Sequence, residues 1–145
     1  MVQKLIDDML DTMAEFHGVG LAAPQVHEGI RIFVASLDEG GEGNADAEPL
    51  AIINPEITVV GSDVTEDWEG CLSIPDIRGK VPRYMRVKVR GLDREGTRQE
   101  LQLTGFPARV VQHENDHLDG VLFVDRMGTF KTLTFLEEYG KHWRD

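Results

Sequence analysis

Residues 112–117, with the sequence QHENDH, constrain the fold of this chain more than any other stretch. Residues four apart lie on one face of an α-helix, so a helix here places His113 and His117 where one metal ion can bind both. Glu114 then projects close to that ion, where a carboxylate can accept a proton from water and deliver it to a leaving group. This H-E-x-x-H pattern is typical of metal-dependent hydrolases. The alternative is two surface histidines on an ordinary helix.

The neighbouring residues weaken that alternative. Val110 and Val111 share the helical spacing of the histidines, so we expect the imidazoles to be partly buried, where an unpaired ring is costly. Pro107 suits the first turn of such a helix, and Gly120 suits its end. The sequence therefore predicts a metal-binding helix between these two residues.

A catalytic site of this kind needs a third protein ligand and an open position for water or substrate. The only cysteine, Cys71, follows Gly70 in a segment that reads as a strand edge or loop, and glycine permits close backbone approach there. A lone cysteine is more often a small buried apolar residue. One cysteine and two histidines nevertheless form a coherent ligand set for Fe²⁺, Zn²⁺, Co²⁺ or Ni²⁺.

Composition bounds the class of protein. A chain of 145 residues with 41% hydrophobic and 28% charged residues is expected to form one soluble domain. Its net charge of −11 argues against a surface that binds nucleic-acid phosphates. No apolar run approaches the length of a membrane span, and residues 1–4 lack the apolar core of a signal peptide. A single cysteine excludes an internal disulfide, which favours an intracellular location.

Hydrophobic patterning predicts an amphipathic helix over residues 2–17 and a last helix over 132–143. It predicts strands at residues 31–37, 50–54, 57–60, 84–92 and 97–104. The last two form a hairpin around the turn at 93–96. Residues 38–48, rich in glycine and acidic residues, are expected to form a solvated loop.

Three segments together resemble the signature motifs of the peptide deformylase family, in that family's order: residues 18–25 (GVGLAAPQ), 69–73 (EGCLS) and 112–117 (QHENDH). The resemblance runs through most of the chain. It implies an α+β fold of mostly antiparallel sheets packed around a central metal-binding helix. It also implies a single catalytic domain over residues 1–145, without the lead-in segment that family members usually carry before the first helix.

The resemblance implies a hydrolase that removes the formyl group from N-formylmethionyl peptides of newly made proteins and releases formate. Cys71, His113 and His117 would hold the metal, and Glu114 would act as the acid and base. The side chain of Gln25 and the backbone N–H of Leu72 would stabilise the oxyanion.

The same resemblance suggests how a peptide would bind. Gly20 and Gly70 would pair with the substrate backbone. By position, the candidates for an apolar methionine pocket are Val19, Phe106 and Val110. Arg78 either flanks the path of the peptide or is an ordinary exposed arginine.

Two further carboxylates are expected to support the site. Glu69 has Arg83 as a candidate salt-bridge partner, in a context that resembles the family's. Asp116 is a candidate for orienting a histidine through its free ring nitrogen.

The family's physiological ion is typically Fe²⁺, and Zn²⁺, Ni²⁺ or Co²⁺ can occupy the same site. The implied partners are nascent formylmethionyl peptides in a bacterial cytoplasm, with the ribosome as an open case because the C-terminal sequence looks atypical. Neither a nucleic acid nor a membrane is expected as a partner.

Two alternatives to a deformylase remain open at the level of sequence. One is a deformylase-like domain that binds metal or peptide but is impaired or inactive, although a structural site would need neither Glu114 nor Gln25. The other is a zinc endopeptidase in which Glu137 completes the H-E-x-x-H ligands. The endopeptidase leaves the two earlier motifs unexplained.

Overall fold

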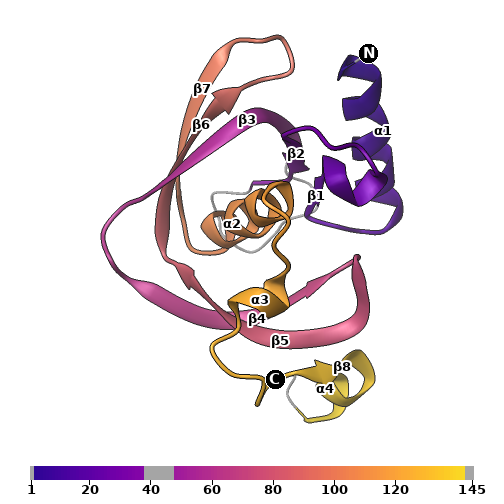
Figure 1. Ribbon diagram of the computed structural model, residues 1–145, viewed down its shortest axis with the longest axis vertical. Helices are drawn as coiled ribbons and strands as arrows, with labels where there is room; N and C mark the ends of the chain where they lie inside the picture. The colour runs from indigo at the N-terminus through magenta and orange to yellow at the C-terminus, as the bar shows by residue number, and fades with distance from the viewer. Residues whose placement is uncertain (1, 38–47, 143–145) are drawn as a thin grey trace.

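The computed structural model describes residues 2–37 and 48–142 (Figure 1). Its elements are α1 (Val2–Glu15), β1 (Gly20–Ala22), the 3-10 helix η1 (Ala23–Val26), β2 (Ile32–Ala35), β3 (Leu50–Val59), β4 (Val64–Cys71), β5 (Ile74–Tyr84), β6 (Arg86–Leu92), β7 (Arg98–Thr104), α2 (Phe106–Leu118), α3 (Phe123–Arg126), β8 (Thr134–Phe135) and α4 (Leu136–His142). The loop predicted at 38–48 lies outside the described residues apart from Glu48. No helix in the two described ranges is long and apolar enough to cross a lipid bilayer.

The strands form two antiparallel sheets, one in the order β1-β2-β3-β6-β7 and the other in the order β4-β5-β8. The predicted hairpin at 84–104 is confirmed as the pairing of β6 with β7. The two runs predicted on either side of Pro55 join into one strand, β3, whose register against β6 shifts between Ile53 and Glu56. Proline has no N–H to donate to a ladder, and such an irregularity accommodates it.

Helix α2 lies in the middle of the molecule, enclosed by the curved sheets (Figure 1, orange). It begins with Pro107 in its first turn, as predicted. Ala108 and Val111 are fully buried and belong to the same core cluster as Phe33 and Val87 of the five-stranded sheet. Burying a side chain of the size of valine or phenylalanine contributes about 1.5–3 kcal/mol, so this packing fixes the helix against the sheet. The predicted α+β fold around a central helix is confirmed.

Helix α1 is amphipathic, as its sequence predicts. Its buried side chains, spaced three or four residues apart, are Ile6, Met9 and Met13. They pack against Leu21 and Val34, so the helix covers the edge of the sheet formed by β1 and β2. The helix ends at Glu15, two residues before the predicted His17, which has a left-handed φ of 56°.

The C-terminal part differs from the predicted single helix over 132–143. Thr134 and Phe135 instead form β8, which pairs with Ile77 and Arg78 of β5, and the helix α4 begins only at Leu136. β-Branched and aromatic residues favour a strand where a sheet edge is available to pair with. The predicted end of the helix at Trp143 lies outside the described residues.

Candidate metal centre and active site

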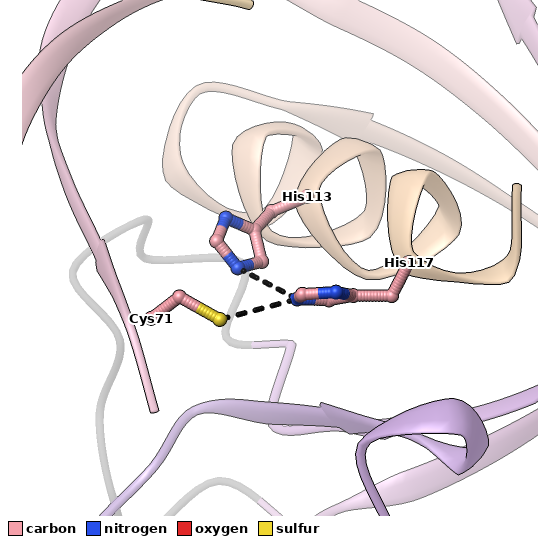
Figure 2. Close-up of side chains that lie close together, drawn as sticks. All are labelled: Cys71, His113 and His117. Carbon is pink, nitrogen blue, oxygen red and sulfur yellow. Dashed lines mark hydrogen bonds between the residues drawn. The ribbon is translucent and has the colours of Figure 1, made fainter. Parts of the chain in front are cut away.

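Helix α2 and the end of strand β4 bring three potential metal ligands together. His113 and His117 lie one turn apart, with 3.3 Å between their Nε2 atoms. The Sγ atom of Cys71 lies 3.2 Å from Nε2 of His117. Figure 2 shows the cysteine approaching the two imidazoles from the strand that faces the helix. Within the described residues, these three are the group whose ligand atoms all lie within 4.8 Å of one another.

The electrostatics of this cluster suit a soft divalent cation. Burial alone would raise the pKa of the Cys71 thiol, but hydrogen bonds with both imidazoles and with the Ser73 N–H outweigh it and lower that pKa to about 5. Burial alone would lower the pKa of His113, yet its contacts with Cys71 and Glu69 raise it to about 10. A thiolate is therefore already present at neutral pH, and a cation would displace the imidazolium proton. The chemistry of the donor set fits a metal of the Fe²⁺ or Zn²⁺ type.

Glu114 is a buried acidic residue with a raised pKa, next to the three potential metal ligands. Its side chain is buried, and its Oε1 atom has no hydrogen-bond partner among the described residues. Burial raises the pKa of this carboxyl to about 7, despite the nearby histidines. Gly20 of β1 allows it to sit there, because a Cβ atom on that glycine would lie 2.5 Å from Oε2 of Glu114. A carboxyl that titrates near neutrality can both accept and release a proton.

Gln25 is oriented by its own backbone neighbours. Its Oε1 atom accepts the Ala22 N–H at 2.9 Å. Its Nε2 atom donates to the Ser73 hydroxyl at 3.1 Å and reaches the sulfur of Cys71 at 3.5 Å. The amide N–H groups thus face Cys71 and Ser73. Leu72 follows Cys71 in the turn between β4 and β5.

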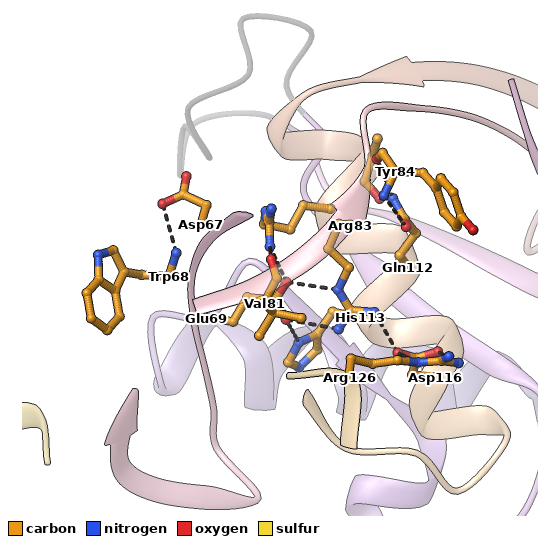
Figure 3. A network of polar contacts seen from close by, with 12 residues as sticks. Asp67, Trp68, Glu69, Val81, Arg83, Tyr84, Gln112, His113, Asp116 and Arg126 are labelled. Atoms are coloured by element: carbon orange, nitrogen blue, oxygen red, sulfur yellow. Dashed lines mark hydrogen bonds and ion pairs between the residues drawn. The ribbon is translucent and has the colours of Figure 1, made fainter. Parts of the chain in front are cut away.

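A buried network of charges supports His113 (Figure 3). Glu69 accepts hydrogen bonds from Arg83 at 2.9 and 3.0 Å and from Arg109 at 2.6 Å, and its Oε1 atom lies 2.9 Å from Nδ1 of His113. Burial alone would raise the pKa of Glu69, but the bonds with His113 and Arg83 hold it at about 2. The predicted salt bridge between Glu69 and Arg83 is confirmed.

The prediction that Asp116 orients a histidine is wrong. Its carboxylate binds Arg83 at 2.6 Å and Arg126 at 2.9 Å, and the carboxylate on a histidine is that of Glu69. Asp116 and His117 are adjacent on the helix and project in different directions, so one cannot readily reach the other's ring. Sequence reasoning missed Arg109. Its spacing of four residues from His113 was the available signal, since both lie on one face of α2.

The site opens into a cleft of about 480 Å³. The predicted site residues that line it are Val19, Gly20, Gln25, Gly70, Cys71, Leu72, Arg78, Phe106, Val110, His113 and Glu114. The remaining one, His117, contacts Cys71. The cleft also contains Phe16, Trp68 and Leu136, which sequence reasoning did not assign to it. Arg78 is half-buried, and its guanidinium lies against Gly70, unlike an ordinary exposed arginine.

Glu137, the ligand that an endopeptidase would use, is not part of the cluster. It lies on α4, and its exposed carboxylate is 3.5 Å from Lys141. The third candidate ligand beside the two histidines is therefore Cys71.

A cysteine and two histidines lie together beside a buried carboxylate, at a cleft that Cys71, His113 and Glu114 line, and this arrangement is typical of a metal-dependent hydrolase. The sequence model of the polypeptide deformylase family matches residues 1–132. The chain belongs to the polypeptide deformylase family.

Individual relatives agree with the family match. Peptide deformylase 2 of Nostoc sp. is 48% identical over 140 residues, which cover 95% of this chain and 78% of the relative. The peptide deformylase of Salinibacter ruber is 46% identical over 136 residues, covering 90% of this chain and 70% of the relative. A class I type b peptide deformylase from Acinetobacter baumannii, solved with Met-Ala-Ser bound, is 42% identical with a TM-score of 0.78, covering 87% of this chain and 80% of that one. These relatives support a deformylase over the two alternatives.

Proposed function

We propose that this cleft binds the N-formylmethionyl end of newly made peptides and that its residues hydrolyse the formyl amide, releasing formate. The observation that carries the proposal is the cluster of Cys71, His113 and His117 beside the unpartnered Oε1 atom of Glu114. A purely structural metal site would not need a buried carboxylate without a hydrogen-bond partner.

Cys71, His113 and His117 would hold one divalent cation. When bound, that cation supplies a Lewis acid that lowers the pKa of water and polarises a carbonyl oxygen. We propose Fe²⁺ as the physiological ion by resemblance to the family, with Zn²⁺, Ni²⁺ and Co²⁺ as substitutes, because thiolate and imidazole donors suit all four. Glu69 would hold His113 in the orientation that leaves Nε2 free for the ion.

Glu114 would move the proton. Its carboxylate would accept a proton from the attacking water and later deliver it to the nitrogen that leaves with the peptide. Burial raises the pKa of this carboxyl above its usual value, which helps it to hold the proton between the two transfers. Gln25 and the backbone N–H of Leu72 would donate to the oxyanion that forms on the formyl carbon's oxygen. The bond from Ala22 to Gln25 supports this role, since it keeps the amide from turning its oxygen toward the site.

The peptide would bind as an additional strand. β1 and β4 are edge strands of the two sheets in the described part of the chain, and both border the cleft, through Gly20 and Gly70 respectively. An extended peptide can pair its backbone with such an edge. Apolar side chains from Val19, Phe106 and Val110 would surround the methionine. Arg78 would flank the path of the chain.

Residues 1–145 would then form one catalytic domain working on nascent peptides in a bacterial cytoplasm. The match to the family over residues 1–132 supports a single domain.

Formate release tests this proposal directly. The protein, purified without oxygen and supplied with Fe²⁺ or Ni²⁺, is expected to release formate from formyl-Met-Ala-Ser. A Cys71→Ser variant is expected to lose most of the bound metal and the activity together, because a hydroxyl is a poor ligand for these ions. Metal content by elemental analysis and formate by a coupled assay provide the readout. A wild-type protein with one metal per chain and no formate release would reject the function.

A Gly20→Ala variant is expected to lose about 10-fold or more in kcat/KM. The added methyl group would lie 2.5 Å from Oε2 of Glu114, and this buried carboxylate has little room to retreat. The bound metal should remain, because no metal ligand is displaced. Gly29, where an added Cβ meets nothing within 4 Å, provides the matched control as Gly29→Ala. Equal rates for the two variants would show that the contact between β1 and Glu114 has no role in the reaction.

A further inference from the structure

The C-terminal segment β8–α4 lies beyond the residues that the family's sequence model matches, yet it reaches the substrate cleft. The family match ends at residue 132, whereas β8 and α4 occupy residues 134–142. Leu136, the first residue of α4, lines the cleft and is 38% exposed. A leucine left this exposed at the wall of a substrate cleft is available to contact a bound peptide.

Two contacts hold the start of this segment against the β4–β5 hairpin. β8 pairs with Ile77 and Arg78, so Leu136 follows directly beside the stretch of β5 that borders the cleft. The Thr132 hydroxyl accepts the N–H of Lys80 at 2.9 Å. Figure 1 shows the resulting unit lying against the β4–β5 hairpin, on the opposite side of that hairpin from α1.

The ring contact between Trp68 and Tyr139 joins α4 to strand β4. The two rings meet edge to face with 5.0 Å between their centroids, and the Lys80 ammonium lies 5.6 Å from the centroid of Trp68. Trp68 itself lines the cleft. The position of α4 is therefore coupled to a residue on the same wall as Gly70.

The direction of β4 indicates which part of the peptide would come near this wall. Cys71, at the end of β4, lies at the metal centre, and Trp68 lies three residues back along the strand. A strand advances about 3.3 Å per residue. The part of a peptide that pairs with β4 beside Trp68 would therefore lie about 10 Å from the reacting carbon. That distance corresponds to the residues that follow the formylmethionine.

We propose that Leu136, held in place by the contact between Tyr139 and Trp68, is a specificity-determining residue that favours an apolar side chain at the two positions after the formylmethionine. The proposal rests on the function proposed above. Phe16 and Leu72, exposed at 57% and 46%, add apolar surface to the same cleft. A peptide with leucine at one of these positions would cover this surface, whereas serine or alanine would leave it in water.

The test compares three peptides: formyl-Met-Ala-Ser, formyl-Met-Leu-Ser and formyl-Met-Ala-Leu. The wild-type protein is expected to prefer at least one leucine peptide over formyl-Met-Ala-Ser, and Leu136→Ala is expected to reduce that preference about 10-fold. The change should appear mainly in KM, because the contact is made equally in the ground state and the transition state. Tyr139→Ala should move the preference in the same direction, and Leu136→Met should restore it.

Phe130→Ala is the matched control. Phe130 precedes β8, is 63% exposed and does not line the cleft, so its removal should leave the preference unchanged. A wild-type preference that survives in Leu136→Ala, or a wild-type protein without any preference, overturns the proposal. A wild-type protein that releases no formate from any of the three peptides overturns the proposed function instead.

Discussion

Replacing Glu114 by glutamine is expected to lower the rate of formate release by about 10²- to 10⁴-fold, the usual contribution of a positioned acid or base. Glutamine has nearly the same shape, so it fits the buried space beside Gly20, but it can neither accept nor deliver the proton. The metal should stay at one per chain, because Glu114 is not among the clustered ligands. Single-turnover formate release and elemental analysis of the same sample measure both quantities.

Glu137→Gln is the appropriate control for this substitution. It makes the same chemical change on an exposed carboxylate of α4, so neither metal content nor rate should change. A Glu114→Gln variant that retains its full rate would exclude the proton-transfer role. Loss of metal from that variant would instead mean that Glu114 contributes to the rate by keeping the metal bound.

Replacing Glu69 by glutamine is expected to reduce the free energy of unfolding of the metal-free protein by about 3–5 kcal/mol, as breaking a buried ion pair usually does. Glu69 is 7% exposed and is the partner of two buried arginines, Arg83 and Arg109. Without the charge of Glu69, both guanidinium groups would remain buried. Arg109 would keep only neutral backbone acceptors. Arg83 would keep only the carboxylate of Asp116, which also binds Arg126. Urea unfolding followed by circular dichroism provides the measurement.

Arg126→Gln shows how much of this effect depends on burial. Arg126 also binds the network, through Asp116, but half of its side chain is exposed to solvent. Its removal should cost about 1 kcal/mol or less, because water screens and replaces the interaction. Similar losses for the Glu69 and Arg126 variants would contradict the view that buried charge dominates this network.

The sequence was most informative where a local period or motif was strong. Helix α2 was predictable from the spacing of His113, His117 and their valine neighbours, and the β6–β7 hairpin from its alternation around a turn. Strands β4 and β5 were not predicted as a hairpin, because much of β4 is exposed and polar and shows no apolar alternation. That hairpin is held by pairing between its two strands, and the sequence of one strand alone does not show which segment it pairs with.

The cluster of Cys71, His113 and His117 could be predicted because few residue types bind such ions, whereas most of the charged network around it could not. Glu69 and Arg83 were paired by resemblance, but Arg109 and Arg126 are ordinary arginines until the fold brings them to Glu69 and Asp116. Leu136 illustrates the same limit. Its place in the cleft depends on two residues of β8 that pair with β5, and the helical pattern of the surrounding sequence concealed them.

The cleft lies beside two sheet edges, β1 and β4, and such edges bind through backbone groups that all amino acids share. Backbone pairing of a peptide along these edges would not depend on the peptide's sequence. The consequence would be a broad range of substrates, because one enzyme could act on every newly made chain that begins with the same modified residue. Side chains at the wall of the cleft would then change only how fast each substrate is processed.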